Sequence, residues 1–239
     1  MNTNTMHRKL YEHLEEAIGL RIIKGEYTAG ATLPNEDALC AEFGVSRGVV
    51  REAVKVLQKK GLVRPRPKIG TQIQPEAQWN LFDADLLVWK LSIGNPLQFL
   101  RKVTEVRGII ESEASTLSAG RAAAEEVDDI RIRFDRLDAS LNDEGTFDYE
   151  DYLEADMAFH AAILEASHNE LLAQIGRTMN HAIRTARQED VHDIGTILIY
   201  HPFHAAIMEA IARRQPEAAG KASREMFALL CEEMSRDAA

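Results

Sequence analysis

The sequence has few cysteines, since Cys40 and Cys231 are the only two among its 239 residues. Two isolated thiols build neither a disulfide framework nor a zinc knuckle, so we expect both to be buried thiols in a reducing cytoplasm. Long apolar runs are also missing, because none approaches the roughly 18 residues that a membrane helix needs. The first ten residues lack the hydrophobic core of a signal peptide. These absences predict a soluble, cytoplasmic protein without a membrane partner.

Basic residues are outnumbered by acidic ones, 28 Lys and Arg against 38 Asp and Glu, but they are unevenly distributed. Residues 1–75 contain 12 basic and 8 acidic residues, whereas the remainder contains 16 and 30. A basic segment joined to an acidic one predicts that DNA binding is confined to the amino-terminal part. The acidic remainder would repel phosphates.

Helix caps and stops recur at short intervals between residues 33 and 73. Polar residues precede two segments with helical apolar periodicity and glycines follow them, which predicts helices over residues 36–43 and 47–60. The caps and stops are Asn35, Gly44, Ser46 and Gly61. Two strands over 62–63 and 71–73 should then flank a hairpin tip. This is the layout of a winged helix-turn-helix, which we place in residues 1–75.

The second of these helices should carry a basic face, because residues four apart lie on one side of a helix. Val50, Val54 and Leu57 are expected inward, and the basic residues on another face are Arg47, Arg51 and Lys55. Residues 59–68 add five basic residues and no acidic one. Such clusters attract the DNA backbone, although a run of charge on a helix is also compatible with a merely solvated face. The helix-turn-helix layout favours DNA.

The ordered motifs of this segment resemble the amino-terminal signature of the GntR family of bacterial transcription regulators. The matching residues are Leu33-Pro34-Asn35-Glu36, Val45-Ser46-Arg47, Val50-Arg51-Glu52-Ala53, Gly61-Leu62 and Gly70-Thr71. The resemblance implies major-groove contacts from Arg47 and Arg51 and a minor-groove contact from Arg66 or Lys68. The full DNA-binding set expected is Ser46, Arg47, Arg51, Lys55, Arg66, Lys68 and Gly70. Asp37 departs from the pattern, because the family usually has an arginine there.

The rest of the chain has a helical pattern. Residues 76–95 are predicted to be a linker with a linker helix, and residues 96–239 an all-α bundle. Turn-forming residues divide the chain from Trp79 onward into about seven helical segments. The buried stripe predicted for the first long helix is Leu97, Leu100, Val103, Val106, Ile109 and Ile110. The fold class is therefore mainly α, with a small β-hairpin wing.

Asp156 and His160 are spaced four residues apart and so share one face of a helix. His204, on a later helix, could bring its imidazole against that face. A carboxylate with imidazoles suits a divalent transition metal such as Zn, Mn or Ni. The same spacing is also common in helices that bind no metal, so the pattern alone leaves both interpretations open.

Residues 105–226 resemble the all-helical effector domain of the fatty-acid-regulator subfamily of GntR proteins, the FCD domain. The matching residues are Glu105-Val106-Arg107, Glu111, Asp156, His160, His204, Ile207, Ala210 and Ile211. In metal-binding members an aspartate and three histidines hold the ion, and an arginine helps to bind the effector carboxylate. The resemblance implies that Asp156, His160 and His204 bind metal and effector, with Arg107 as the arginine. A helix salt bridge to Glu111 or Glu105 is the plainer interpretation of Arg107.

Met226 aligns with the position where such a domain has its fourth ligand histidine, and a thioether is a poor ligand for these metals. Either the site keeps three protein ligands, with water and effector completing it, or the metal is absent. His201 could substitute, but it is more simply a surface or core histidine. No metal role is expected for the remaining candidates, His168, His181 and His192.

The segment from Gln78 to Trp89 resembles the linker of the galactonate-operon repressor branch of the family. That resemblance implies a small carboxylate effector, a sugar acid such as an aldonate or a hexuronate. The plainer interpretation is that Trp79 and Trp89 pack the linker onto the bundle.

Together these features predict a homodimeric repressor of a sugar-acid catabolic operon. Two winged heads would bind a palindromic double-stranded DNA operator, and the effector would release them. One alternative is a metal-dependent hydrolase or lyase with an appended DNA-binding module. The sequence has no Gly-rich phosphate cradle and no nucleophile motif, which argues against an enzyme. A regulator that dimerises through the bundle and senses nothing is a third possibility.

Overall fold

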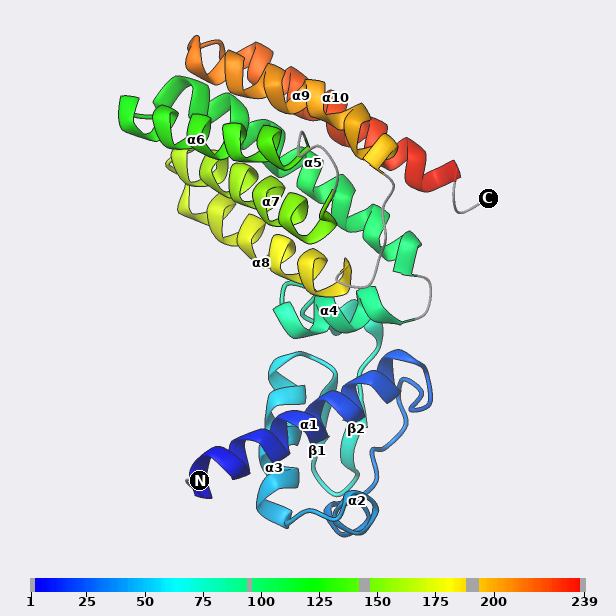
Figure 1. Cartoon of the computed structure of the whole chain (residues 1–239). Coiled ribbons are helices and arrows are strands. Elements are labelled where there is room, and N and C mark those ends of the chain that lie inside the picture. The colour runs from blue at the N-terminus through cyan, green and yellow to red at the C-terminus, as the bar shows by residue number, and fades with distance from the viewer. Residues whose placement is uncertain (1–2, 94–95, 142–146, 188–193, 237–239) are drawn as a thin grey trace. The chain divides into compact units, whose positions relative to one another are not determined.

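The computed structural model describes residues 3–93, 96–141, 147–187 and 194–236. The chain divides into two compact units, Met1–Pro96 and Leu97–Ala239 (Figure 1). Both units are built mainly from helices, as the sequence predicts. Across the described residues, no helix has the length and apolar character needed to cross a membrane.

The first unit is a winged helix-turn-helix followed by a short helix. Its elements are α1 (Thr3–Ile23), α2 (Glu36–Phe43), α3 (Arg47–Lys59), β1 (Val63–Arg66), β2 (Gly70–Ile73), the 3₁₀ turn η1 (Glu76–Gln78) and α4 (Ala84–Ser92). The predicted caps hold. Asn35 Oδ1 accepts from the amide of Ala38 at 2.9 Å, and Ser46 Oγ accepts from the amide of Val49 at 3.4 Å. Gly44 ends α2 in the left-handed conformation.

The wing strands are longer than the sequence predicts. β1 and β2 pair antiparallel from Val63 opposite Ile73 to Arg66 opposite Gly70, so the tip shrinks to three residues. Pro65 was expected in the tip but pairs with Thr71, because a proline without an amide proton is tolerated at the edge of a two-stranded hairpin. An antiparallel β-bridge between Thr32 and Gln72 joins the free edge of β2 to the segment before α2.

Tryptophans 79 and 89 belong to the core of the first unit, which corrects the expectation that they pack the linker onto the bundle. Trp89 is buried against α1, where a Cβ added to Gly19 would lie 2.4 Å from the indole. Trp79 packs on the same core and donates its indole N–H to the carbonyl of Gln74 at 3.0 Å. Because Gly19 has no side chain, α1 leaves room at this position for the indole ring of Trp89 to be buried.

The second unit is a bundle of α5 (Pro96–Arg121), α6 (Ala124–Leu141), α7 (Tyr149–Ala166), α8 (Glu170–Arg187), α9 (Ile194–Ala212) and α10 (Pro216–Arg236). With α4 they make seven helices after Trp79 in the described chain, as predicted. Helix α7 packs between α6 and α8, and α9 packs on α6 and α10 (Figure 1). Phe159 lies fully buried at the centre of the apolar core.

The buried stripe predicted for α5 is wrong in part. Leu100 and Val103 are buried and Ile110 is partly buried, but Leu97, Val106 and Ile109 are exposed. The face that turns inward instead carries polar residues, among them Thr104, Arg107, Glu111, Ser112 and Ser115. Apolar periodicity therefore missed part of the inward face, because that face of the helix also lines a polar site. Both cysteines are half-buried rather than buried.

Candidate functional site

The basic face of α3 is exposed, and each of its three cations is paired with a carboxylate. Arg47 Nη2 lies 2.8 Å from Asp37 Oδ1, and Lys55 Nζ lies 2.8 Å from Glu52 Oε1. Arg51 donates its Nε–H to both oxygens of Glu36 at 3.0 Å. The hydrogen bond from Arg51 lowers the pKa of Glu36 below its usual value. Exposed pairs of this kind contribute little to stability, so DNA phosphates can compete for these cations.

A groove of about 670 Å³ lies between α3 and the wing formed by β1 and β2. Arg51 and Lys55 line it from α3, and Ile69 and Gly70 line it from the hairpin. Arg66 and Lys68 belong to the same hairpin, close in sequence to the residues that line the groove, and both are exposed. A Cβ on Gly70, whose φ is 107°, would lie 2.9 Å from Thr32 Cγ2. Gly70 therefore contributes backbone shape, whereas the cations contribute charge.

Lys60 corrects the prediction of five exposed basic residues between 59 and 68. Its side chain is only 3% exposed and its Nζ lies 2.6 Å from Asp83 Oδ1, 2.6 Å from Asp85 Oδ2 and 3.2 Å from Glu15 Oε1. These acids come from α1 and from the start of α4. Lys60 is thus a structural cation inside the first unit and not part of a DNA-binding surface.

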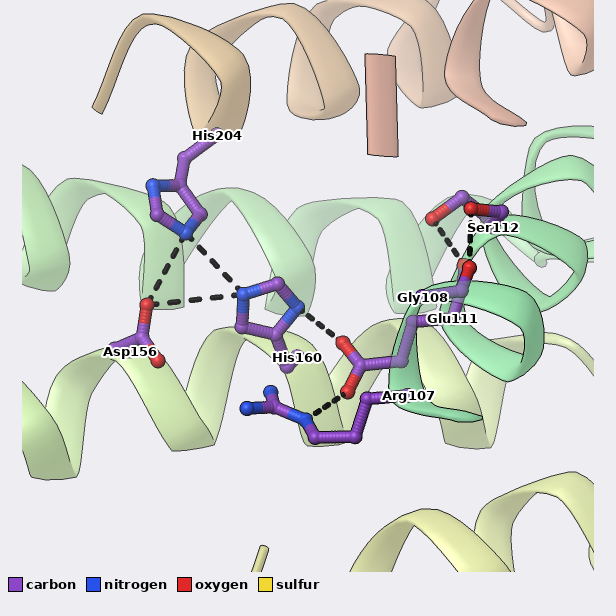
Figure 2. A network of polar contacts seen from close by, with 8 residues as sticks. Arg107, Gly108, Glu111, Ser112, Asp156, His160 and His204 are labelled. Carbon is purple, nitrogen blue, oxygen red and sulfur yellow. Dashed lines mark hydrogen bonds and ion pairs between the residues drawn. The ribbon is translucent and has the colours of Figure 1, made fainter. Parts of the chain in front are cut away.

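In the second unit the structure brings together the three predicted metal ligands, as Figure 2 shows. Asp156 and His160 project from α7 and His204 from α9. His204 Nε2 lies 3.1 Å from Asp156 Oδ1 and 3.2 Å from His160 Nε2, and His160 Nε2 lies 3.7 Å from Asp156 Oδ1. His160 and His204 are buried. Two imidazole nitrogens and a carboxylate oxygen therefore converge on one point.

Glu111 and Arg107 support this point from α5. Glu111 Oε2 lies 2.6 Å from His160 Nδ1, and Arg107 Nε donates to Glu111 Oε1 at 2.7 Å (Figure 2). Because Nδ1 faces a carboxylate, the neutral ring favours its proton on Nδ1, and Nε2 then turns its lone pair toward Asp156 and His204. The plainer interpretation of Arg107, a salt bridge with Glu111, is therefore present in the structure.

The electrostatics of the site follow from its burial. Burial by itself would raise the pKa of Glu111, but the neighbouring Arg107 and His160 outweigh it and lower that pKa to about 2. Burial would also raise the pKa of Asp156, but the neighbouring His160 and His204 outweigh it and lower that pKa. Burial would lower the pKa of His160, but Glu111 and Asp156 outweigh it and raise that pKa. Burial lowers the pKa of His204. The carboxylates are thus held charged inside the bundle.

The donor set fits a divalent transition metal. Two imidazole nitrogens that face each other at 3.2 Å share at most one proton, whereas a cation between them and Asp156 would engage both lone pairs. The three ligand atoms all lie within 4.8 Å of one another. Among the described residues they are the one such group of histidine, cysteine and carboxylate side chains. The arrangement would supply three protein ligands to such an ion and would leave further coordination positions for a small molecule.

The other histidines do not join this group. His201 Nε2 lies 2.8 Å from Asp138 Oδ1 and its ring stacks on Phe134, so the substitution considered for the missing fourth ligand is not made. His168 pairs with Glu126 at the surface, and His181 is exposed. His192 lies outside the described residues. Met226 is buried and, like Asp156, His160 and His204, lines a cavity in the second unit.

A cavity of about 170 Å³ opens beside the triad of Asp156, His160 and His204, and these three residues and Arg107 line it. Arg107 also lies over the ring of Phe227, with its guanidinium carbon 5.1 Å from the ring centroid. Further along the cavity the Tyr200 hydroxyl donates to Glu233 Oε2. Sequence reasoning missed Tyr200 and Glu233. Helical spacing could have found them, since Tyr200 is four residues from His204 and Glu233 is seven from Met226.

The chain belongs to the GntR family of bacterial regulatory proteins, which matches residues 10–73, and carries an FCD domain, which matches residues 102–229. GntR helix-turn-helix domains bind DNA, and FCD domains bind small effector ligands and commonly metal ions. The protein is therefore a DNA-binding transcription regulator and not an enzyme, which rules out the hydrolase or lyase alternative.

Two relatives and one solved structure are similar to this chain over most of its length. An uncharacterised helix-turn-helix transcriptional regulator of Escherichia coli K12, YieP, is 36% identical over 217 residues, which cover 90% of each chain. The galactonate operon transcriptional repressor of the same strain is 29% identical over 212 residues, 88% of this chain and 90% of that protein. The solved structure of Lar, a regulator of the Listeria monocytogenes agr system, matches with a TM-score of 0.62 at 20% identity. The match covers 99% of this chain and 98% of Lar, so it shows a shared fold.

Proposed function

We propose that the protein is a homodimeric repressor whose DNA binding in the cytoplasm is released by a small carboxylate effector. The observation that carries this proposal is the cavity in the second unit, where Arg107 and the triad Asp156, His160 and His204 meet. A buried cation beside converging metal ligands is a suitable receptor for an anionic group.

The metal expected at the triad is Zn, Mn or Ni. Asp156 Oδ1 and the Nε2 atoms of His160 and His204 would hold it, and Glu111 would fix the ring of His160. A bound ion of this kind offers a Lewis-acid position to an effector oxygen. Arg107 would orient the carboxylate, since its Nε is held by Glu111 while its terminal amino groups remain to bind a ligand.

The effector proposed is a sugar acid, an aldonate or a hexuronate. The galactonate operon repressor is a relative along most of its length, which supports an aldonate. The cavity also offers polar groups beyond the carboxylate site, namely the Tyr200 hydroxyl and Glu233, which suit hydroxyl groups.

On the DNA side, Arg47, Arg51 and Lys55 with Ser46 would enter the major groove, and Arg66 or Lys68 with Gly70 would follow the adjacent minor groove. One winged head makes few base contacts, so two heads on a palindromic operator are expected to supply specificity. The effector would act by binding preferentially to a conformation whose heads no longer match the half-site spacing. Such coupling is typically worth about 1–3 kcal/mol.

Thermal unfolding of the purified protein tests the sensor. The protein is measured with and without EDTA against galactonate, gluconate, galacturonate, a fatty acyl compound and a small dicarboxylate. Stabilisation by one sugar acid that EDTA abolishes is the expected result. The same acid should release the protein from its operator in a gel-shift titration. If no acid stabilises it, the protein is a regulator that dimerises without sensing, and the sensor proposal is wrong.

A further inference from the structure

The effector cavity has a second polar group, which is separate from the triad. Tyr200 and Glu233 line it, and the tyrosine hydroxyl donates to one carboxylate oxygen of Glu233. Tyr200 lies one helical turn from His204 along α9, and Glu233 lies about 10 Å along α10 from Met226. We call Tyr200 and Glu233 the outer pair. The cavity is therefore lined by the Arg107 guanidinium beside Asp156, His160 and His204, and separately by the carboxylate of Glu233.

Among the described residues, no lysine or arginine forms an ion pair with Glu233, and the neutral Tyr200 hydroxyl donates a hydrogen bond to it. A carboxylate has about four acceptor positions, so one donated hydrogen bond leaves it able to accept more. A ligand group at this place is therefore stabilised if it donates a hydrogen bond.

The surroundings of the outer pair strengthen the effect of its charge. Many of the residues that line the same cavity are apolar, among them Leu153, Ile183, Ile197, Leu230 and Met234. Two like charges in such surroundings repel each other more strongly than in water, because little solvent screens them. A second carboxylate on the ligand would face Glu233 at a cost in binding free energy, whereas a hydroxyl would not.

We infer that the outer pair makes the regulator selective for monocarboxylic sugar acids and rejects the corresponding dicarboxylic acids, the aldarates. An aldonate would place its carboxylate near Arg107 and the triad and a distal hydroxyl on Glu233. An aldarate differs from it only in that the distal CH₂OH is a second carboxylate. This inference rests on the proposed function, because it assumes that the cavity binds a sugar acid.

Matched acid pairs test the inference. Binding of galactonate and galactarate, and of gluconate and glucarate, is measured by calorimetry on the full chain with metal present. Each pair shares its carbon chain and differs at the terminal carbon. Wild-type protein is expected to bind the monocarboxylate of the recognised pair at least about tenfold more tightly, since like-charge contacts commonly cost that much or more.

Glu233→Gln keeps the shape of the side chain and removes its charge. The variant is expected to lower the monocarboxylate-to-dicarboxylate affinity ratio by about tenfold, mainly through tighter aldarate binding. Glu232→Gln is the matched control, because Glu232 is exposed on the same helix and does not line the cavity. This control should leave the ratio at its wild-type value. A ratio is compared because a general loss of packing would weaken both acids alike.

The possible outcomes distinguish the selectivity of the outer pair from the sensor function itself. If an aldonate binds but its aldarate binds equally well, or if Glu233→Gln leaves the ratio unchanged, the selectivity of the outer pair is wrong and the sensor stands. If neither member of either pair binds and no other sugar acid stabilises the protein, the sugar-acid sensor falls, and the inference falls with it.

Discussion

His160 Nδ1 lies 2.6 Å from Glu111 Oε2, and both side chains are buried in the bundle. This contact turns Nε2 of the ring toward Asp156 and His204. Acidic residues that hold a ligand histidine in this way also increase its basicity, and their loss typically costs about 10–100-fold in metal affinity. Glu111→Gln should therefore weaken Zn or Mn binding by that factor, as measured by competition with a chelating dye.

The control for this variant is Glu113→Gln, which removes an exposed carboxylate from the same helix. Thermal unfolding in EDTA reports whether either variant disturbs the fold itself. Equal metal affinity in wild type and Glu111→Gln, with intact fold, would show that Glu111 serves only as the partner of Arg107.

Arg51→Ala should weaken operator binding by about 1–3 kcal/mol and leave the fold unchanged. The side chain is exposed, and its ion pair with Glu36 contributes little to stability. Gel-shift titration measures the loss, and thermal unfolding checks the fold. Arg213→Ala is a suitable control, since Arg213 is also exposed and paired with a glutamate but lies in the other unit. Unchanged operator affinity would remove Arg51 from the DNA interface.

Local patterns in the sequence predicted the elements and the shared face of Asp156 and His160, because both depend on short-range spacing, whereas the resemblance to the FCD domain added His204. Caps at Asn35 and Ser46 define helix starts, and the four-residue spacing of Asp156 and His160 places them on one face whatever the rest of the chain does. The contact between Glu111 and His160 joins α5 to α7, and the contact between Tyr200 and Glu233 joins α9 to α10. Contacts between helices depend on packing, which periodicity within one helix does not specify.

The burial of Lys60 likewise depends on contacts that local sequence patterns do not specify. In the sequence it stands in a basic run and suggests a DNA contact, but acids from α1 and from the start of α4 enclose it. The residues that bury it lie 45 positions before it and about two dozen after it, so only the folded chain brings them together. Composition counts a charge without telling whether solvent reaches it.

Lys60→Met should destabilise the first unit by about 3 kcal/mol, because it leaves the buried Glu15 without its cation. Burial raises the pKa of Glu15 even with Lys60 present, and removal of the cation raises it further. A raised pKa means that the folded state gains relative stability as the pH falls through it, since protonation removes the buried charge. The deficit of the variant should therefore be smaller near about pH 5 than near about pH 8.

Urea unfolding at the two pH values measures this deficit, and Lys59→Met is the control because Lys59 is exposed on the same turn. The control should unfold like the wild type at both values. A deficit that is equal at both pH values would mean that Glu15 stays charged, and that Lys60 acts through its contacts with Asp83 and Asp85 alone.

The wing offers a test that depends on charge and not on fold. Arg66 is exposed at the end of β1, and its backbone pairs with Gly70. If Arg66 contacts a phosphate, its removal releases about one counterion fewer, so the slope of log affinity against log salt should shrink by about 0.9 in Arg66→Ala. Operator titrations at several salt concentrations measure that slope. Arg133→Ala, on α6 of the second unit, should leave it unchanged. A slope that stays at the wild-type value in Arg66→Ala would mean that Arg66 makes no phosphate contact and that Lys68 or the cations of α3 supply the charge that DNA contacts.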